Sequence, residues 1–170
     1  DYDAVDSLLD AAARRLDADP SSREEDRVAL TDVRGAVRME QGRYAESESL
    51  KAIVLASRRR RLGPRDPETL RAQANLAASL MSLAKYAEAA EQFTNTVYEQ
   101  SDSLQPVIDK LKLEKRSATV QRAPAAGATG ALASAKLLEA VFGNDAVKNK
   151  RNTDAVEVGT NQLASARVVQ

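Results

Sequence analysis

The chain has 170 residues, and its 25 lysine and arginine residues are balanced by 25 aspartate and glutamate residues. A nucleic-acid-binding domain usually carries a basic excess, so this balance argues against a nucleic-acid partner. Hydrophobic residues make up 43% of the chain but aromatic residues only 4%. This composition predicts closely packed helices with a core of alanine, leucine and valine.

Cysteine, histidine and tryptophan are absent. Without the first two there is no disulfide, no thiolate or imidazole metal ligand and no serine–histidine triad. We therefore expect a protein that is not an enzyme, with no catalytic residue, no metal site and no cofactor. There is no run of about 18 apolar residues, so no transmembrane helix is expected. The start of the chain has no signal-peptide pattern, which favours an intracellular protein that is not secreted.

The spacing of apolar residues predicts helices over residues 1–18, 23–41 and 44–61. Ser22, followed three residues later by Glu25, has the pattern of a capping box at the start of the second helix. Gly42 is expected to end that helix, and the Gly63–Pro64 pair to end the third.

Asp66 and Pro67 have the residue types of an N-cap and a first helical position, so a fourth helix is expected to begin there. We expect it to stop at Ala84–Lys85 and a partner helix to run from Tyr86 to Gln100.

After residue 100 the sequence changes character. Residues 101–116 predict one short helix, residues 117–128 a linker, residues 129–143 a further helix and residues 144–170 an extended, irregular tail. The tail is too polar to bury much apolar surface by itself, so we expect it to wrap around a second partner or to fold back.

Tyr2, Tyr44 and Tyr86 are spaced 42 residues apart, and a fixed period of this size is typical of stacked-repeat proteins. The phrase YAEAAEQF, preceded by NLAASLMSLAK, and the loop LGPRDPETL resemble the tetratricopeptide repeat, most closely the 42-residue variety of kinesin light chains. The resemblance covers residues 1–100. The unit before the best-matched one departs from the pattern, with Arg34 in the place of Leu76 and Lys51 in the place of Phe93.

The resemblance implies an all-α fold: an antiparallel helix-pair solenoid, followed here by a C-terminal helix and the irregular tail. It also implies a concave groove, lined by the first helix of each unit, that holds an extended peptide or a partner helix. Asn75 matches the family's groove asparagine, whose amide both donates to and accepts from a peptide backbone. Two methionines spaced one repeat apart offer an adaptable apolar floor, or simply pack between units. The groove residues expected by register are Asp32, Val33, Met39, Arg71, Asn75, Ala78 and Met81.

Arg58–Arg61 has the composition of a nucleic-acid patch. We favour a helix C-terminus whose cations suit the helix dipole and are neutralised by acidic neighbours, because no aromatic residues are interleaved.

We expect a non-catalytic scaffold or adaptor that binds protein partners as a subunit of a larger assembly, with no nucleic acid and no small-molecule substrate. Two alternatives stay open: a peripheral structural subunit of an organellar membrane complex, and an accessory or regulatory helical domain of a longer enzyme. The chain begins inside a repeat at Asp1, so we expect residues before it, either in a longer chain or in a removed targeting segment. The compartment is therefore left open between the cytoplasm and the interior of an organelle.

Overall fold

A computed structural model describes residues 2–169, so Asp1 and Gln170, at the ends of the predicted segments 1–100 and 144–170, lie outside the described residues. The chain divides into two compact units, residues 1–84 and residues 85–170.

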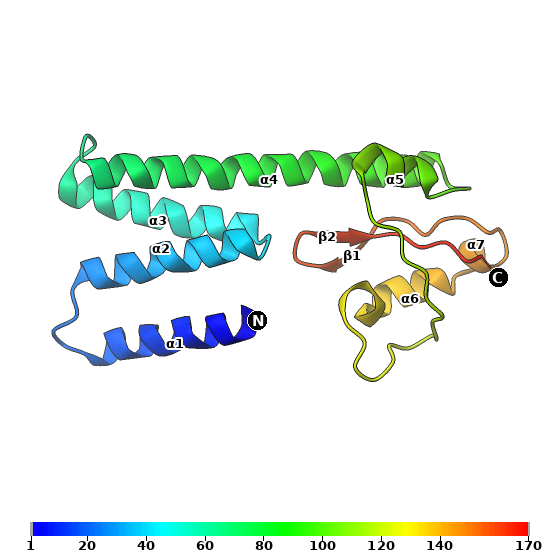
Figure 1. The fold of residues 1–170 in the computed structure, drawn as a ribbon, viewed down its shortest axis with the longest axis horizontal. Helices are drawn as coiled ribbons and strands as arrows, with labels where there is room; N and C mark the ends of the chain where they lie inside the picture. Colours follow the sequence, from blue (N-terminus) through cyan, green and yellow to red (C-terminus); the bar gives the residue numbers. More distant parts are fainter. Residues whose placement is uncertain (1, 170) are drawn as a thin grey trace. The chain divides into compact units, whose positions relative to one another are not determined.

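Unit 1 is a stack of helices. It contains α1 (Tyr2–Ala18), α2 (Glu24–Glu40), α3 (Tyr44–Leu62) and the first part of α4 (Pro67–Glu99), which lie side by side in Figure 1. The prediction of a mostly helical fold with stacked helix pairs is confirmed.

The helix ends of unit 1 follow from single residues. Gly42 adopts a φ of +73° and ends α2, and the amide of Arg43 then donates to the Arg38 carbonyl at 2.8 Å. Asp66 accepts a hydrogen bond from the Glu68 amide at 2.8 Å, as expected for the residue that caps α4.

The start of α2 differs from the prediction. Asp26 accepts a hydrogen bond from the Arg23 amide at 3.0 Å, so the capping box lies one residue later than the expected pair of Ser22 and Glu25. The hydroxyl of Ser22 donates instead to the Leu16 carbonyl at 2.6 Å, which ties the turn to the end of α1.

The core of unit 1 contains Val28 of α2, Val54 of α3 and Ala72 of α4. Ser47 of α3 is fully buried and donates to the Gly35 carbonyl at 2.8 Å. Its hydroxyl also lies 2.9 Å from that of Ser79 in α4. Small side chains at this crossing let the three helices approach closely, because no larger group has to be accommodated.

A row of ion pairs joins α1 to α2. Three arginines of α2 pair with three aspartates of α1, in an order that shows the two helices to be antiparallel. The three pairs are Arg27–Asp17 at 3.6 Å, Arg34–Asp10 at 2.5 Å and Arg38–Asp6 at 2.6 Å.

A more buried ion pair joins α2 to α3. The ammonium of Lys51 lies 2.6 Å from the Asp32 carboxylate, and the guanidinium of Arg58 lies 3.0 Å from its other oxygen. Burial by itself would raise the pKa of Asp32, but the hydrogen bond from Lys51 and the charges of Lys51 and Arg58 outweigh it and hold that pKa below its ordinary value of 3.8.

A single helix, α4, replaces the two helices predicted over 66–83 and 86–100 (Figure 1). One repeat earlier, the position of Ala84 is held by Gly42, which adopts the left-handed conformation that turns the chain. Alanine is the best helix former and resists that conformation, so the helix continues through Ala84 and Lys85.

Unit 2 combines the end of α4 with short elements. These are α5 (Gln105–Leu111), the 3-10 turn η1 (Gly130–Ala133), α6 (Ala135–Val141), α7 (Asn144–Val147), β1 (Val156–Gly159) and β2 (Gln162–Ala164). The two strands pair antiparallel, with Val156 opposite Ala164, and β1 packs on α6 and η1. The buried apolar side chains are Val97, Val107, Leu137, Leu138, Val141 and Ala146.

The C-terminal stretch is more ordered than the irregular tail that the sequence predicts. Alternation around Val156 and Val158, followed by the turn residues Gly159 to Asn161, forms the hairpin. The buried Asn152 anchors this stretch, because its amide donates to the Gln100 and Ser103 carbonyls at 2.9 and 3.0 Å. The division of the chain into five segments stays a prediction.

Replacing Gly42 with alanine is expected to lower the free energy of unfolding by about 1 kcal/mol, because alanine must then adopt a left-handed conformation. An added Cβ meets no atom within 4 Å, so the loss reports backbone strain alone. Urea denaturation followed by circular dichroism measures it. Gly42→Asn is the matched control and should cost less, since asparagine tolerates this conformation; equal losses would contradict the explanation.

Replacing Asp32 with asparagine is expected to cost about 2 kcal/mol, because it leaves the buried ammonium of Lys51 without its carboxylate. Since the pKa of Asp32 is lowered in the folded state, its contribution is complete above 3.8 and is lost as the pH falls through the folded pKa. The difference between Asp32→Asn and the unmodified chain should therefore shrink in acid.

Asp10→Asn serves as the control for this titration, since the Asp10 side chain is 60% exposed and its pair with Arg34 is solvated. It should cost less than about 1 kcal/mol. A difference between Asp32→Asn and the unmodified chain that stays constant down to strongly acidic pH would count against the ion pair.

Candidate functional site

Most of the groove residues predicted from the resemblance lie on the outer surface of α2 and α4. Val33 is 51% exposed on α2 and Met81 is 61% exposed on α4. Arg71 and Ala78 are also exposed, and Met39 and Asn75 are half-buried. We call these six residues the repeat face: Val33, Met39, Arg71, Asn75, Ala78 and Met81.

Helical spacing brings the α4 members of the repeat face together. Arg71, Asn75 and Ala78 follow one another at intervals of four and three residues, so they share one side of the helix. The guanidinium of Arg71 is held by Glu68 at 2.6 Å, which leaves a partly neutralised charge at one end of this side.

Asp32 is not part of this surface in the structure. Its carboxylate points to α3, where it is bound by Lys51 and Arg58. The side chain therefore joins two helices of the stack, whereas Val33 beside it is open to solvent.

The run of arginines at the end of α3 has acidic neighbours. Arg58 contacts Asp32, Arg60 lies 3.0 Å from Glu24 and Arg61 lies 3.2 Å from Glu25. Over residues 2–169, Arg59 is the one member of the run without an ion pair.

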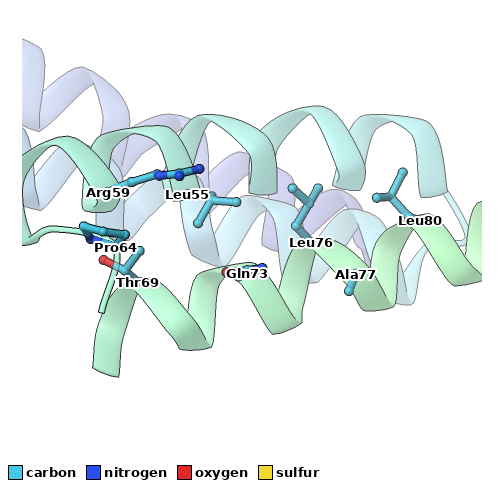
Figure 2. Close-up of a pocket in the computed structure, with 8 residues that line it drawn as sticks. All are labelled: Leu55, Arg59, Pro64, Thr69, Gln73, Leu76, Ala77 and Leu80. Carbon is cyan, nitrogen blue, oxygen red and sulfur yellow. The ribbon is translucent and has the colours of Figure 1, made fainter. Parts of the chain in front are cut away.

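Arg59 instead lines a groove of about 400 Å³ between α3 and α4. Figure 2 shows Arg59 and Leu55 projecting from α3, with Arg59 beside Pro64 and Thr69 at one end of the groove and Leu80 at the other. We call this surface the α3/α4 groove; the residues that define it here are Leu55, Arg59, Thr69, Leu76, Ala77 and Leu80.

The α3/α4 groove has leucines along its walls, Gln73 between Thr69 and Leu76, and Arg59 with Thr69 at one end. Leu55, Leu76 and Leu80 form its walls. The hydroxyl of Thr69 has no hydrogen-bond partner among the described residues, although the side chain is buried. The sequence carries a signal for this groove: Leu76 and Leu80 stand where the preceding repeat has Arg34 and Arg38.

Two kinds of site are missing from the part of the chain that the structure describes. Residues 2–169 contain no cluster of three or more acidic side chains placed to hold a metal ion. Within the same residues, no helix has both the length and the apolar character that crossing a bilayer requires.

Comparison with known families gives one match. The tetratricopeptide repeat family matches residues 27–96, which run from α2 through α3 into α4. Searches of curated proteins and of solved structures return no match. The match covers the residues whose phrases carry the resemblance, and it includes all six residues of the repeat face. The chain therefore contains a tetratricopeptide repeat region over residues 27–96.

Proposed function

We propose that the chain is a non-catalytic scaffold or adaptor subunit that binds an extended peptide or a helix of a protein partner on its repeat face. A tetratricopeptide repeat region implies protein–protein interaction, and the family match covers this face. The spacing of Tyr2, Tyr44 and Tyr86 further supports the 42-residue, kinesin-light-chain-like variety of the repeat.

The observation that carries the proposal is the exposure of large apolar side chains on the repeat face. Val33 and Met81 each leave about half or more of their surface in water. Methionine adapts its shape to different partners, and the amide of Asn75 nearby can pair with the N–H and C=O groups of a peptide backbone. Burial of the apolar side chains would supply affinity, and the amide would supply orientation.

Photo-crosslinking of the full chain tests the proposal. A photoreactive amino acid placed at Ala78 should crosslink a protein partner in cell extract. The same amino acid at Ala56, which is exposed on α3 and lies outside the repeat face, should not crosslink that partner.

The affinity of the identified partner should then fall about tenfold or more in the double variant Asn75→Ala with Met81→Ala, since central apolar and hydrogen-bonding contacts dominate such interfaces. Isothermal titration calorimetry measures the change. Unchanged affinity in this variant would rule out the repeat face as the binding surface.

A further inference from the structure

One side of α4 is left uncovered by the described residues of unit 1. Leu70 is 53% exposed, and Ala74 and Ala77 are also exposed. These three residues follow one another at intervals of four and three, so they share one side of the helix. We call them the α4 stripe. The side of α4 that packs on α3 is a different one, where Ala72 and Ser79 are buried.

The preceding repeat shows what covers the equivalent side of α2. One repeat earlier, the positions of the α4 stripe are held by Val28, Asp32 and Gly35, which are buried or half-buried. All three lie under α3, the helix that follows α2 after the turn at Gly42. The contacts are Val28 with Val54, Asp32 with Lys51 and Gly35 with Ser47.

A helix with the matching sequence follows the α4 stripe in this chain. Residues 86–99 stand one repeat after α3 and begin with the same Tyr-Ala-Glu phrase. They differ from α3 in step with the stripe. The ion pair of Asp32 with Lys51 is replaced by Ala74 and Phe93, and the contact of Gly35 with Ser47 is replaced by Ala77 and Ala89. Both charges are lost together, so residues 86–99 still suit the stripe.

Two features keep α4 straight instead of turning back. Ala84 stands in the place of Gly42 and resists the left-handed conformation of the turn. The hydrogen bond between Ser57 and Glu24 has no counterpart, because the equivalent residues are the two carboxylates Glu99 and Asp66. Both features favour the straight helix while the contacts of the stripe itself stay matched.

In the straight form, residues 86–99 use this same side within unit 2. Phe93 is half-buried there, and Thr96, the counterpart of Val54, is only 9% exposed. Burial and the charge of Glu157 raise the pKa of the Tyr86 hydroxyl, so β1 lies close to the start of the segment. One side of a helix cannot be buried twice. The C-terminal elements of unit 2 and the α4 stripe therefore compete for residues 86–99.

We propose that residues 86–99 switch between two partners: the C-terminal elements of unit 2 when α4 is straight, and the α4 stripe when the chain turns at Ala84–Lys85. The turned form completes a third helix pair and frees the C-terminal elements from the segment. The repeat face stays open in both forms, because Val33 and Ala36, the counterparts of Asn75 and Ala78, are exposed beside α3. The switch therefore stands or falls independently of repeat-face binding.

Disulfide trapping in the full chain tests the proposal, since the chain has no cysteine of its own. Ala77→Cys with Ala89→Cys marks the turned form, because the counterparts Gly35 and Ser47 are in contact. In the straight helix the two positions lie about 18 Å apart, whereas a disulfide needs Cα atoms within about 7 Å. With oxidised glutathione we expect a disulfide within one chain, identified by mass spectrometry of its proteolytic peptides.

The matched control is Ala78→Cys with Ala89→Cys. Its positions are one residue closer along α4, but Ala36, the counterpart of Ala78, is exposed instead of lying under α3. This pair should form its disulfide at least about tenfold more slowly. Equal rates for the two pairs would reflect fraying of the helix and would overturn the proposal.

Restoring the glycine of the turn should favour the turned form. Ala84→Gly weakens the straight helix and accepts the left-handed conformation, so it should speed trapping of the Ala77→Cys and Ala89→Cys pair about tenfold. The rate is measured relative to the control pair in the same background, because general unfolding would raise both. An unchanged ratio would contradict a turn at this position.

Loosening the C-terminal elements should act in the same direction. Asn152→Ala removes the side-chain hydrogen bonds to the Gln100 and Ser103 carbonyls, so it should also raise the trapping ratio. A ratio that Asn152→Ala leaves unchanged would overturn the competition. A disulfide that joins two chains, detected as a dimer by non-reducing electrophoresis, would overturn the proposal as well, since the segment would then cover the stripe of a second copy.

Discussion

The close approach of α2 and α3 at Gly35 is the contact on which unit 1 depends. An added Cβ at Gly35 would lie 3.0 Å from the Cε of Lys51, so the Lys51 side chain would have to shift from its place against α2. The same crossing places Ser47 on the Gly35 carbonyl and Lys51 on Asp32. The hydrogen bond from Ser47 to Gly35 forms only when α2 and α3 lie close together. It therefore fixes the distance between the two helices at which Val28 and Val54 pack.

The repeat keeps its register while its chemistry changes from one unit to the next. Arg34 and Arg38, which bind aspartates of α1, become Leu76 and Leu80, and the pair of Asp32 and Lys51 becomes Ala74 and Phe93. The positions that carry ion pairs in the first layers therefore carry apolar or small side chains on α4. This change in residue type along the stack suits a repeat array that is followed by a different kind of structure, as it is here by unit 2.

Periodicity predicts the helices of unit 1 well because each apolar stripe is regular and each turn has its own glycine or proline. The unbroken α4 is harder to predict, since the repeat phrase around Tyr86 is intact. The difference that matters is at the turn, where Ala84 stands in the place of Gly42. The hairpin is hard to predict because a short alternation of apolar and polar residues between turns is a weak signal within a polar stretch. Its anchor, Asn152 on the carbonyls of Gln100 and Ser103, joins residues far apart in sequence and leaves no local signal.

For the candidate site, register placed Val33, Arg71 and Ala78 on the exposed surface but misplaced Asp32, because the residue that neutralises it, Lys51, departs from the family pattern. Spacing along one helix predicts which side chains share a face. It does not predict which of them form contacts with a neighbouring helix. The α3/α4 groove depends on two helices at once, so only the assembled unit reveals it.

The row of ion pairs between α1 and α2 has a consequence for the way unit 1 opens. Two of the three pairs are well exposed to water, and dissolved salt screens such pairs, whereas the apolar contacts between α2 and α3 are insensitive to it. Rising ionic strength should therefore loosen α1 before the rest of the stack, and hydrogen exchange would detect it as early opening of that helix. The loosened state would present Arg27 and Arg34 without their aspartates, whereas Arg38 would keep its ion pair with Glu46 of α3 at 3.4 Å. Helix α1 thus neutralises the arginines of α2 at low salt and exposes them as the ionic strength rises.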